Sequence, residues 1–256
     1  MEMLVVNNLY KSFGGVKAVS NINMKIEEGQ IVGLIGPNGA GKTTFFNLLT
    51  GIYSPSSGDI VYKLNQEISS INFRPSRMVK YGVARTFQNI RLFKEMTVLE
   101  NVLIGYHNNF KYNLFTSLFR LPGYYKHEDE AYDEVVELLK TFNLYDKKDV
   151  LAKNLPYGEQ RKVEIARALA SKPKLLLLDE PAAGMNPQET RELTELIQWI
   201  REEFDLTVIL IEHDMSLVMD LCDDIIVFNY GTLLARGTPE EIQNNPEVIK
   251  AYLGGE

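Results

Sequence analysis

A glycine-rich turn constrains the fold of this 256-residue chain more than any other feature of its sequence. In the stretch GLIGPNGAGKTTFFNLL, four residues separate Gly36 from Gly41, and the turn lies between an apolar run and a helical pattern. This is the pattern of a phosphate-binding loop, in which successive backbone N–H groups and the helix dipole face one anion. We therefore predict a nucleoside triphosphate site rather than a glycine-rich turn with an incidental lysine. Lys42 would reach the β- and γ-phosphates, and the Thr43 hydroxyl would bind Mg²⁺. The predicted nucleotide-binding residues of the loop are Gly36, Pro37, Asn38, Gly39, Ala40, Gly41, Lys42, Thr43 and Thr44.

Two further motifs stand where an apolar run ends, and we predict that they complete this site. LLLLDEP delivers Asp179 and Glu180, and VILIEHDM delivers His213. Sheets of parallel strands place ligands at the carboxyl ends of the strands. Asp179 is expected to hold the magnesium shell through water, and Glu180 to orient or deprotonate the attacking water. His213 would contact the γ-phosphate or hold that water in line. The alternatives are two solvated carboxylates that cap a strand, and a structural histidine.

The apolar runs themselves predict an α/β fold. QIVGLI, KLLLLD, TVILIE and DIIVF do not alternate with polar residues, which is typical of strands buried on both faces of a parallel sheet. Helical patterns such as QETRELTELIQWIREEF separate these runs. Near the N-terminus, MLVVNNL and AVSNINMKI alternate as half-buried antiparallel strands do. The predicted fold is a P-loop NTPase (RecA-like) α/β core with an N-terminal antiparallel β subdomain.

A central region shows helical periodicity and no convincing buried strand. In EDEAYDEVVELLKTFNL, four apolar residues from Ala131 to Phe142 recur on one helical face. We predict an α-helical subdomain inserted into the core. The predicted organisation is a single domain, 1–256, with the nucleotide-binding core at 1–89 and 171–256 and the helical subdomain at 90–170.

Charge and cysteine content exclude some classes of partner. The net charge of −7 argues against a broad basic surface for nucleic acid. Cys222 is the only cysteine and stands between Leu221 and Ile225, so we expect it to be buried and not disulfide-bonded. Apolar runs such as LLLL are shorter than the ~20 residues that span a bilayer, so contact with a membrane would need a partner. The aromatic-rich segment 106–125 either packs within the helical subdomain or docks a partner.

The stretch LPYGEQRKVEIARAL predicts a helix with an unusual beginning. Val163, Ala166 and Leu169 recur at helical spacing, but a proline, a tyrosine and a glycine stand before a Glu-Gln pair. Either an ordinary loop enters an ordinary helix, or the helix N-terminus faces a ligand. The order of motifs decides between these readings. A phosphate loop, a helical insertion, a glycine-led helix, an Asp-Glu strand and a strand-end histidine follow one another, and this order resembles the ATP-binding cassette ATPases over essentially the whole chain.

A closer resemblance is to the ATPase subunits of bacterial and archaeal branched-chain (hydrophobic) amino acid importers. It is carried by ARTFQNIRLF, LPYGEQRKVEIARAL, LDEPAAGMNP, IEHDM and RGTPEEIQNNPEVIKAYLG. The resemblance implies an ATPase that uses ATP and Mg²⁺ to drive uptake through membrane permease subunits. It also implies a peripheral location at the cytoplasmic face of the cell membrane. A periplasmic or extracellular solute-binding protein would act indirectly, and no nucleic acid partner is expected.

The same resemblance implies roles for further residues. Two such subunits, identical or sister chains, pair head to tail, with each ATP between the phosphate loop of one and the signature helix of the other. Gly158, with Tyr157 and Glu159, would present the first helical turn to the partner's γ-phosphate. Phe13 would stack on adenine, or else be a core aromatic. Gln88 would contact Mg²⁺ and the water, or else be an ordinary surface glutamine.

Two positions depart from the usual pattern of the family. The signature usually reads Leu-Ser-Gly-Gly-Gln, and Pro156 here removes both a hydroxyl and an N–H. Backbone groups near Gly158 would then carry more of the contact, and Glu159 would repel phosphate unless it is turned away. Asn186 stands where an aspartate is usual, so a contact across the dimer would lack that charge.

Three rival functions remain open from sequence. An importer of urea, an amide or another amino acid would have a very similar ATPase. A cassette ATPase that acts on DNA or ribosomes is disfavoured by the acidic charge and by the lack of coiled-coil heptads. A phosphate-loop kinase would need an arginine-rich lid, and the 120–170 region holds few arginines.

Overall fold

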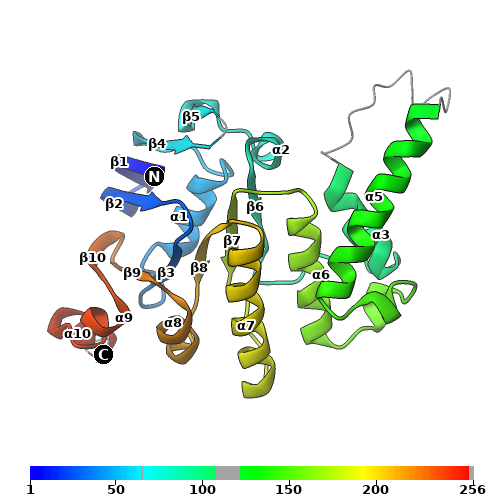
Figure 1. The fold of residues 1–256 in the computed structure, drawn as a ribbon. Helices are drawn as coiled ribbons and strands as arrows, with labels where there is room; N and C mark the ends of the chain where they lie inside the picture. The colour runs from blue at the N-terminus through cyan, green and yellow to red at the C-terminus, as the bar shows by residue number, and fades with distance from the viewer. Residues whose placement is uncertain (65, 108–121, 254–256) are drawn as a thin grey trace. The chain divides into compact units, whose positions relative to one another are not determined.

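The structure is a computed structural model that describes residues 1–64, 66–107 and 122–253 (Figure 1). Its internal contacts divide the chain into two compact units. The first comprises Met1–Gln88 and Lys174–Glu256, and the second comprises Asn89–Pro173. The predicted boundaries lay within three residues of these, after residues 89 and 170. Most of the aromatic-rich segment, residues 108–121, lies outside the described residues, so its alternative roles stay open.

The first unit holds two sheets. A four-stranded antiparallel sheet has the order β2–β1–β4–β5, and a six-stranded sheet has the order β10–β9–β3–β8–β7–β6. The six-stranded sheet is parallel except for β10, which runs antiparallel to β9. The strands are β1 Glu2–Phe13, β2 Val16–Glu27, β3 Ile31–Ile35, β4 Ser57–Lys63, β5 Glu67–Ser69, β6 Val83–Arg85, β7 Leu175–Asp179, β8 Thr207–Ile211, β9 Asp224–Asn229 and β10 Thr232–Gly237. The predicted α/β fold class is therefore confirmed.

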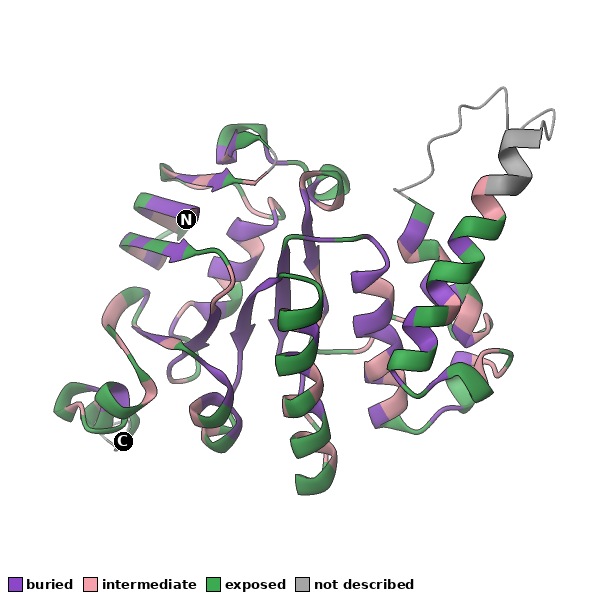
Figure 2. Cartoon of the chain, in the orientation of Figure 1, coloured by how far each residue is buried: buried purple, intermediate pink, exposed green. Residues whose placement is uncertain are grey.

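Strand β3 shows why its apolar run lacks polar residues. All five of its residues are buried, because both faces of the sheet are covered (Figure 2). Val32 and Leu34 belong to a core cluster that also contains Phe45 and Phe46 of helix α1 (Lys42–Leu49) and the inner residues of the antiparallel sheet. Gly33, between them, faces the end of helix α8 (Met215–Leu221). The phosphate loop thus leaves a strand that is fixed on both sides.

The remaining helices of the first unit are mostly short. Helix α7 is amphipathic, and its buried residues Leu193, Ile197 and Ile200 recur at the predicted helical spacing. It contacts α8 (Figure 1). The bounds are η1 Ser70–Asn72, α2 Pro75–Met78, η2 Val79–Tyr81, α7 Pro187–Glu203, α9 Pro239–Gln243 and α10 Pro246–Leu253.

The second unit is helical in the residues described. It contains α3 Val98–Tyr106, α5 Pro122–Thr141, η4 Tyr145–Lys147, η5 Ala152–Asn154 and α6 Tyr157–Leu169, with one isolated bridge between Thr97 and Leu151. The predicted apolar face from Ala131 to Phe142 is buried, which confirms that pattern. Helices α3 and α6 approach closely, since a Cβ on Gly105 would lie 2.0 Å from the Arg167 carbonyl oxygen. None of the described helices is long and apolar enough to cross a membrane.

Candidate nucleotide-binding site

The phosphate loop has the curvature that the glycine pattern predicts. Gly36 and Gly41 have φ values of 148° and 99°. A Cβ at Gly36 would lie 2.1 Å from the Phe228 carbonyl oxygen, and one at Gly41 would lie 2.4 Å from the Ala18 carbonyl oxygen. Both positions therefore exclude any other residue. The Lys42 ammonium donates to the carbonyl oxygens of Gly36, at 2.6 Å, and Pro37, at 3.0 Å.

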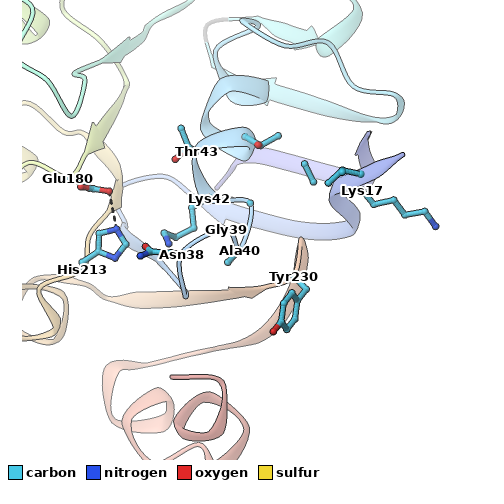
Figure 3. A pocket seen from close by; sticks show the side chains of 13 residues that line it. Lys17, Asn38, Gly39, Ala40, Lys42, Thr43, Glu180, His213 and Tyr230 are labelled. Carbon is cyan, nitrogen blue, oxygen red and sulfur yellow. Dashed lines mark hydrogen bonds and ion pairs between the residues drawn. The ribbon is translucent and has the colours of Figure 1, made fainter. Parts of the chain in front are cut away.

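A pocket of about 420 Å³ opens over the loop (Figure 3). The loop residues from Asn38 to Thr44 line it, together with Glu180 and His213. Gly36 and Pro37 do not line it; they hold the Lys42 side chain from behind. Burial lowers the pKa of Lys42, and the negative charge of Glu180 partly offsets this effect. An incoming phosphate would act in the same direction as Glu180 and favour the charged ammonium.

Four residues of the pocket carry no motif and were missed from sequence. Val16, Lys17 and Ala18 come from strand β2, and Tyr230 comes from the turn between β9 and β10. Backbone hydrogen bonds join these segments, because Gly231 donates to the Ala40 carbonyl and accepts from the Ser20 N–H. The contacts span about two hundred residues of chain, so no local signal announces them.

The structure brings the three predicted catalytic residues together. His213 Nε2 lies 2.9 Å from Glu180 Oε1, and Gln88 Nε2 donates to Glu180 Oε2 at 2.6 Å (Figure 3 shows the His213 contact). Glu180 itself has a left-handed backbone, with φ of 47°, and its N–H donates to the Ile211 carbonyl oxygen. Non-glycine residues in this conformation are strained and concentrate at functional sites. The geometry is that of a carboxylate held between a histidine and an amide.

Glu212 holds the backbone on both sides of this cluster, although the sequence analysis gave it no role. It is buried, its Oε1 accepts from the Ala182 N–H at 2.7 Å, and its Oε2 accepts from the His213 N–H at 2.9 Å. Burial raises the pKa of Glu212, while these backbone donors lower it. The available signal was an acidic residue at the end of a buried strand, directly before His213.

Asp179 lies behind the pocket rather than on its lining. Its Oδ2 accepts from Arg85 Nη2 at 2.6 Å, and both side chains are buried. Among the described residues, no group of three or more His, Cys, Asp or Glu side chains forms a metal cage. The donor set still suits Mg²⁺, which keeps several waters and binds through one or two carboxylates plus substrate phosphates. Thr43 lines the pocket, and Asp179 is the last residue of β7, which β8 separates from β3 in the sheet.

Phe13 is not part of the pocket lining. Its ring meets Tyr53 edge-on, with centroids 5.1 Å apart, and Lys11 Nζ lies 4.9 Å from its centroid. It pairs with Val16 at the end of the β1–β2 hairpin, and Val16 does line the pocket. Phe13 is 42% exposed, so the alternative of a core aromatic is wrong. Its stacking on adenine stays a prediction.

The signature helix α6 begins at Tyr157, with Pro156 as its N-cap and no side-chain cap. Gly158 is buried in the first turn, and Tyr157 is 42% exposed. Glu159 Oε1 forms an ion pair with Lys147 Nζ at 2.5 Å. The charge that would repel a phosphate is thus partnered inside its own unit.

Asn186 is the N-cap of helix α7, a role that was not predicted from the sequence. Its Oδ1 accepts from the N–H groups of Gln188 and Glu189, and the Glu189 carboxylate accepts from the Asn186 N–H. This is a capping box at the start of α7.

Comparison with known proteins agrees with this arrangement. The family model described as "ABC transporter" matches residues 19–183, and the model described as "Branched-chain amino acid ATP-binding cassette transporter" matches residues 232–256. The chain is 49% identical to the high-affinity branched-chain amino acid transport ATP-binding protein LivG of Salmonella typhimurium, over 98% of both chains. It is 48% identical to the corresponding protein BraF of Pseudomonas aeruginosa, also over 98% of both chains.

Solved structures give the same answer. A nucleotide-free ATP-binding cassette from an ABC transporter aligns with a TM-score of 0.83 and 34% identity, over 98% of this chain and 99% of that one. An ATP-binding cassette in its ADP conformation aligns over 100% of both chains, with a TM-score of 0.85 and 32% identity. The chain therefore belongs to the ATP-binding cassette (ABC) transporter family, as one of its ATPases, and the predicted family is confirmed.

Proposed function

We propose that this chain is the ATP-hydrolysing subunit of an importer for branched-chain, hydrophobic amino acids. The observation that carries the proposal is a phosphate loop and a Glu180–His213–Gln88 cluster in a chain that matches LivG along its length. The C-terminal match at residues 232–256 supports the same branch of the family. Membrane permease subunits would be the partners, which would hold the chain at the cytoplasmic face of the membrane. A solute-binding protein outside the cytoplasm would deliver the amino acid.

In the proposed chemistry, the loop amides and Lys42 bind the phosphates, while Glu180 accepts a proton from the attacking water. His213 holds the γ-phosphate or that water in line. Because both Glu180 oxygens are engaged, by His213 and Gln88, the water would replace one of these contacts. Magnesium, bound by Thr43, Gln88 and, through water, Asp179, would neutralise charge that develops on the phosphates.

The proposed site is composite. The first turn of α6, from Tyr157 to Glu159, would contact the γ-phosphate bound by a second subunit, either another copy of this chain or a sister ATPase. The absence of a side-chain cap at Pro156 supports this assignment, because first-turn N–H groups of a helix bind anions when no side chain occupies them. From the importer resemblance we favour a sister ATPase as the partner.

The test is Glu180→Gln. We expect this variant to bind ATP but to lose at least about 10²-fold in kcat, because the general base is gone. Unhydrolysed ATP should then hold two subunits together, and light scattering with saturating Mg-ATP should report a dimer. Lys42→Ala is the matched control and should abolish both binding and pairing. The composite site would be ruled out if the Glu180→Gln chain stayed monomeric in saturating Mg-ATP in two separate samples. One sample contains the chain alone, and the other contains the chain mixed with its sister ATPase.

An experiment that identifies the transported solute needs the membrane partners. The chain should be reconstituted with the permease subunits that copurify with it, and uptake of radiolabelled leucine compared with that of urea and an amide. ATP-dependent leucine uptake that Glu180→Gln abolishes is the expected result. Uptake of urea or the amide instead would reassign the solute and keep the ATPase.

A further inference from the structure

Arg85 is a cation of the nucleotide-binding unit whose side chain is buried, and no motif assigns it a role. It is the last residue of the edge strand β6, and Thr86 continues the pairing by donating to the Leu177 carbonyl oxygen. Its side chain is only 7% exposed. Because an arginine is almost never fully buried without partners, its contacts indicate what it is there to hold.

The guanidinium joins three segments of the site. Nη2 donates to Asp179 Oδ2 at 2.6 Å, at the end of strand β7. Nη1 donates to Asn47 Oδ1 at 2.8 Å and to Thr50 Oγ1 at 3.3 Å, on helix α1 and at its C-cap. Helix α1 begins with Lys42 and Thr43, so one cation ties the carboxylate of the proposed magnesium site to the helix that bears the phosphate-binding side chains.

The third segment is the one that leads to Gln88. The guanidinium carbon lies 5.1 Å from the centroid of the Phe87 ring and 5.4 Å from that of Phe46 on α1, within the range of cation–π attraction. Phe87 immediately precedes Gln88, which bonds Glu180. The guanidinium thus lies near one ring of helix α1 and one ring of the segment that leads to Gln88.

We propose that Arg85 is a positioning residue for magnesium-dependent hydrolysis, one that sets the Asp179 carboxylate and the Gln88 segment against helix α1. This inference rests on the proposed function. With Oδ2 committed to Arg85, the other oxygen, Oδ1, is the one to accept a magnesium-bound water. Outer-shell partners of this kind orient a metal's carboxylates and tune its affinity.

Lysine cannot replace arginine in this role. A guanidinium presents several donors in a rigid plane, which here reaches Asp179 and helix α1 at once and lies within cation–π range of two rings. An ammonium keeps the charge beside Asp179 but offers no planar fork and no stacking face. Arg85→Lys therefore separates the positioning role from simple neutralisation of a buried carboxylate.

The experiment measures nucleotide binding by the full chain as a function of Mg²⁺, with a fluorescent ATP analogue, and steady-state hydrolysis. We expect Arg85→Lys to raise the Mg²⁺ concentration for half-maximal effect by about 10- to 100-fold, since the loss of an outer-shell partner typically has this effect. Binding of the analogue in EDTA should change little. In hydrolysis, kcat should fall while KM for ATP stays close to that of the wild type.

Two further variants keep the test decisive. Arg77→Lys, an exposed arginine of α2 in the same unit, is the matched control and should leave every readout unchanged. Asn47→Ala keeps the Arg85–Asp179 pair and removes one acceptor on α1, so it should shift the Mg²⁺ dependence in the same direction by a smaller factor. It also serves if Arg85→Lys does not fold.

A purely structural role would give a different pattern. Equal loss of analogue affinity with and without Mg²⁺, together with a lower thermal midpoint, would overturn the proposal, as would an unchanged Mg²⁺ dependence in both Arg85→Lys and Asn47→Ala. Failure of the proposed hydrolytic site is distinguishable, because the wild-type chain would then not hydrolyse Mg-ATP even with its sister ATPase present. A different transported solute would leave the Mg²⁺ dependence of every variant unchanged.

Discussion

At the scale of single residues, strand β3 leaves no room for a side chain at its centre. A Cβ on Gly33 would lie 2.8 Å from Sγ of Cys222, the C-cap of helix α8, and 3.3 Å from Val218 Cγ1 in the middle of that helix. Burial raises the pKa of the Cys222 thiol to about 12, so this sulfur packs as a neutral apolar group. Cys222 is buried, as predicted, and the missing Cβ of Gly33 is what allows α8 to approach the sheet.

Gly33→Ala is therefore expected to lower the free energy of unfolding by about 1–3 kcal/mol, the usual cost of overpacking a core. The measurement is urea denaturation. In a Cys222→Ala background the same substitution should cost less, because the sulfur that it meets is gone. An equal cost in both backgrounds would mean that Cys222 does not set the space at Gly33.

Residue-level prediction names candidates where a local motif marks them and misses residues whose contacts depend on long-range partners. Lys42, Glu180 and His213 were predicted because short patterns mark them. The Arg85–Asp179 pair joins residues 94 positions apart, and neither residue indicates the other. Glu212 was missed because its acceptors are used by backbone N–H groups, which any sequence supplies.

At the scale of elements, three strands of the antiparallel sheet are joined by one carboxylate. Glu2 on β1 accepts from Lys25 on β2 at 2.5 Å and from Lys63 on β4 at 2.9 Å. These two hydrogen bonds, Lys25 first, lower the pKa of Glu2 from 4.5 to about 2. Because β1 is central to this sheet, the contact fixes both of its neighbours at their ends.

The sign of the pH effect follows from the lowered pKa. The ionised Glu2 stabilises the folded state above the pKa of the unfolded chain, and this contribution is lost as pH falls from about 4.5 toward 2. The difference in unfolding free energy between wild type and Glu2→Gln should be constant above this window and shrink within it. Urea denaturation at several pH values measures it, and added salt should reduce it. The exposed Glu28→Gln serves as a control, and a difference that grows with acid would contradict the assignment.

Strands and helices were easier to predict from the sequence when they were long enough to show a pattern. The buried strands β3, β7, β8 and β9 were expected from their apolar runs, and β1 and β2 from their alternation. Strand β6 has three residues, too few for any periodicity, yet it carries Arg85 into the sheet. The antiparallel strand β10 is only partly buried, so its pattern is weak.

At the scale of the whole molecule, the proposed function makes activity a property of pairs. A single chain supplies one phosphate loop and one signature helix, and the proposed site needs both from different subunits. Sequence predicted the two-part organisation from a change of periodicity near residue 90. It could not predict the partner, because residues that face another chain obey no pattern within this one.

Specific ATPase activity of the purified chain should therefore rise with protein concentration, since association precedes hydrolysis. Phosphate release per mole of chain, measured over a wide range of concentrations, tests this. Addition of the sister ATPase should raise the activity of a dilute sample further. A specific activity that does not depend on concentration or on the sister chain would indicate a site complete within one polypeptide.

The Lys42 ammonium already donates hydrogen bonds to two carbonyl oxygens of its own loop, those of Gly36 and Pro37. When a nucleotide binds, phosphate oxygens would replace these carbonyl oxygens as acceptors for Lys42, in a loop that is already held in shape. Part of the attraction is offset by the two bonds surrendered, so the first encounter is weaker and more easily reversed than the charge alone implies. An ATPase must release its product in every cycle, and a phosphate loop whose lysine can return to its own carbonyl groups favours that release over tight binding.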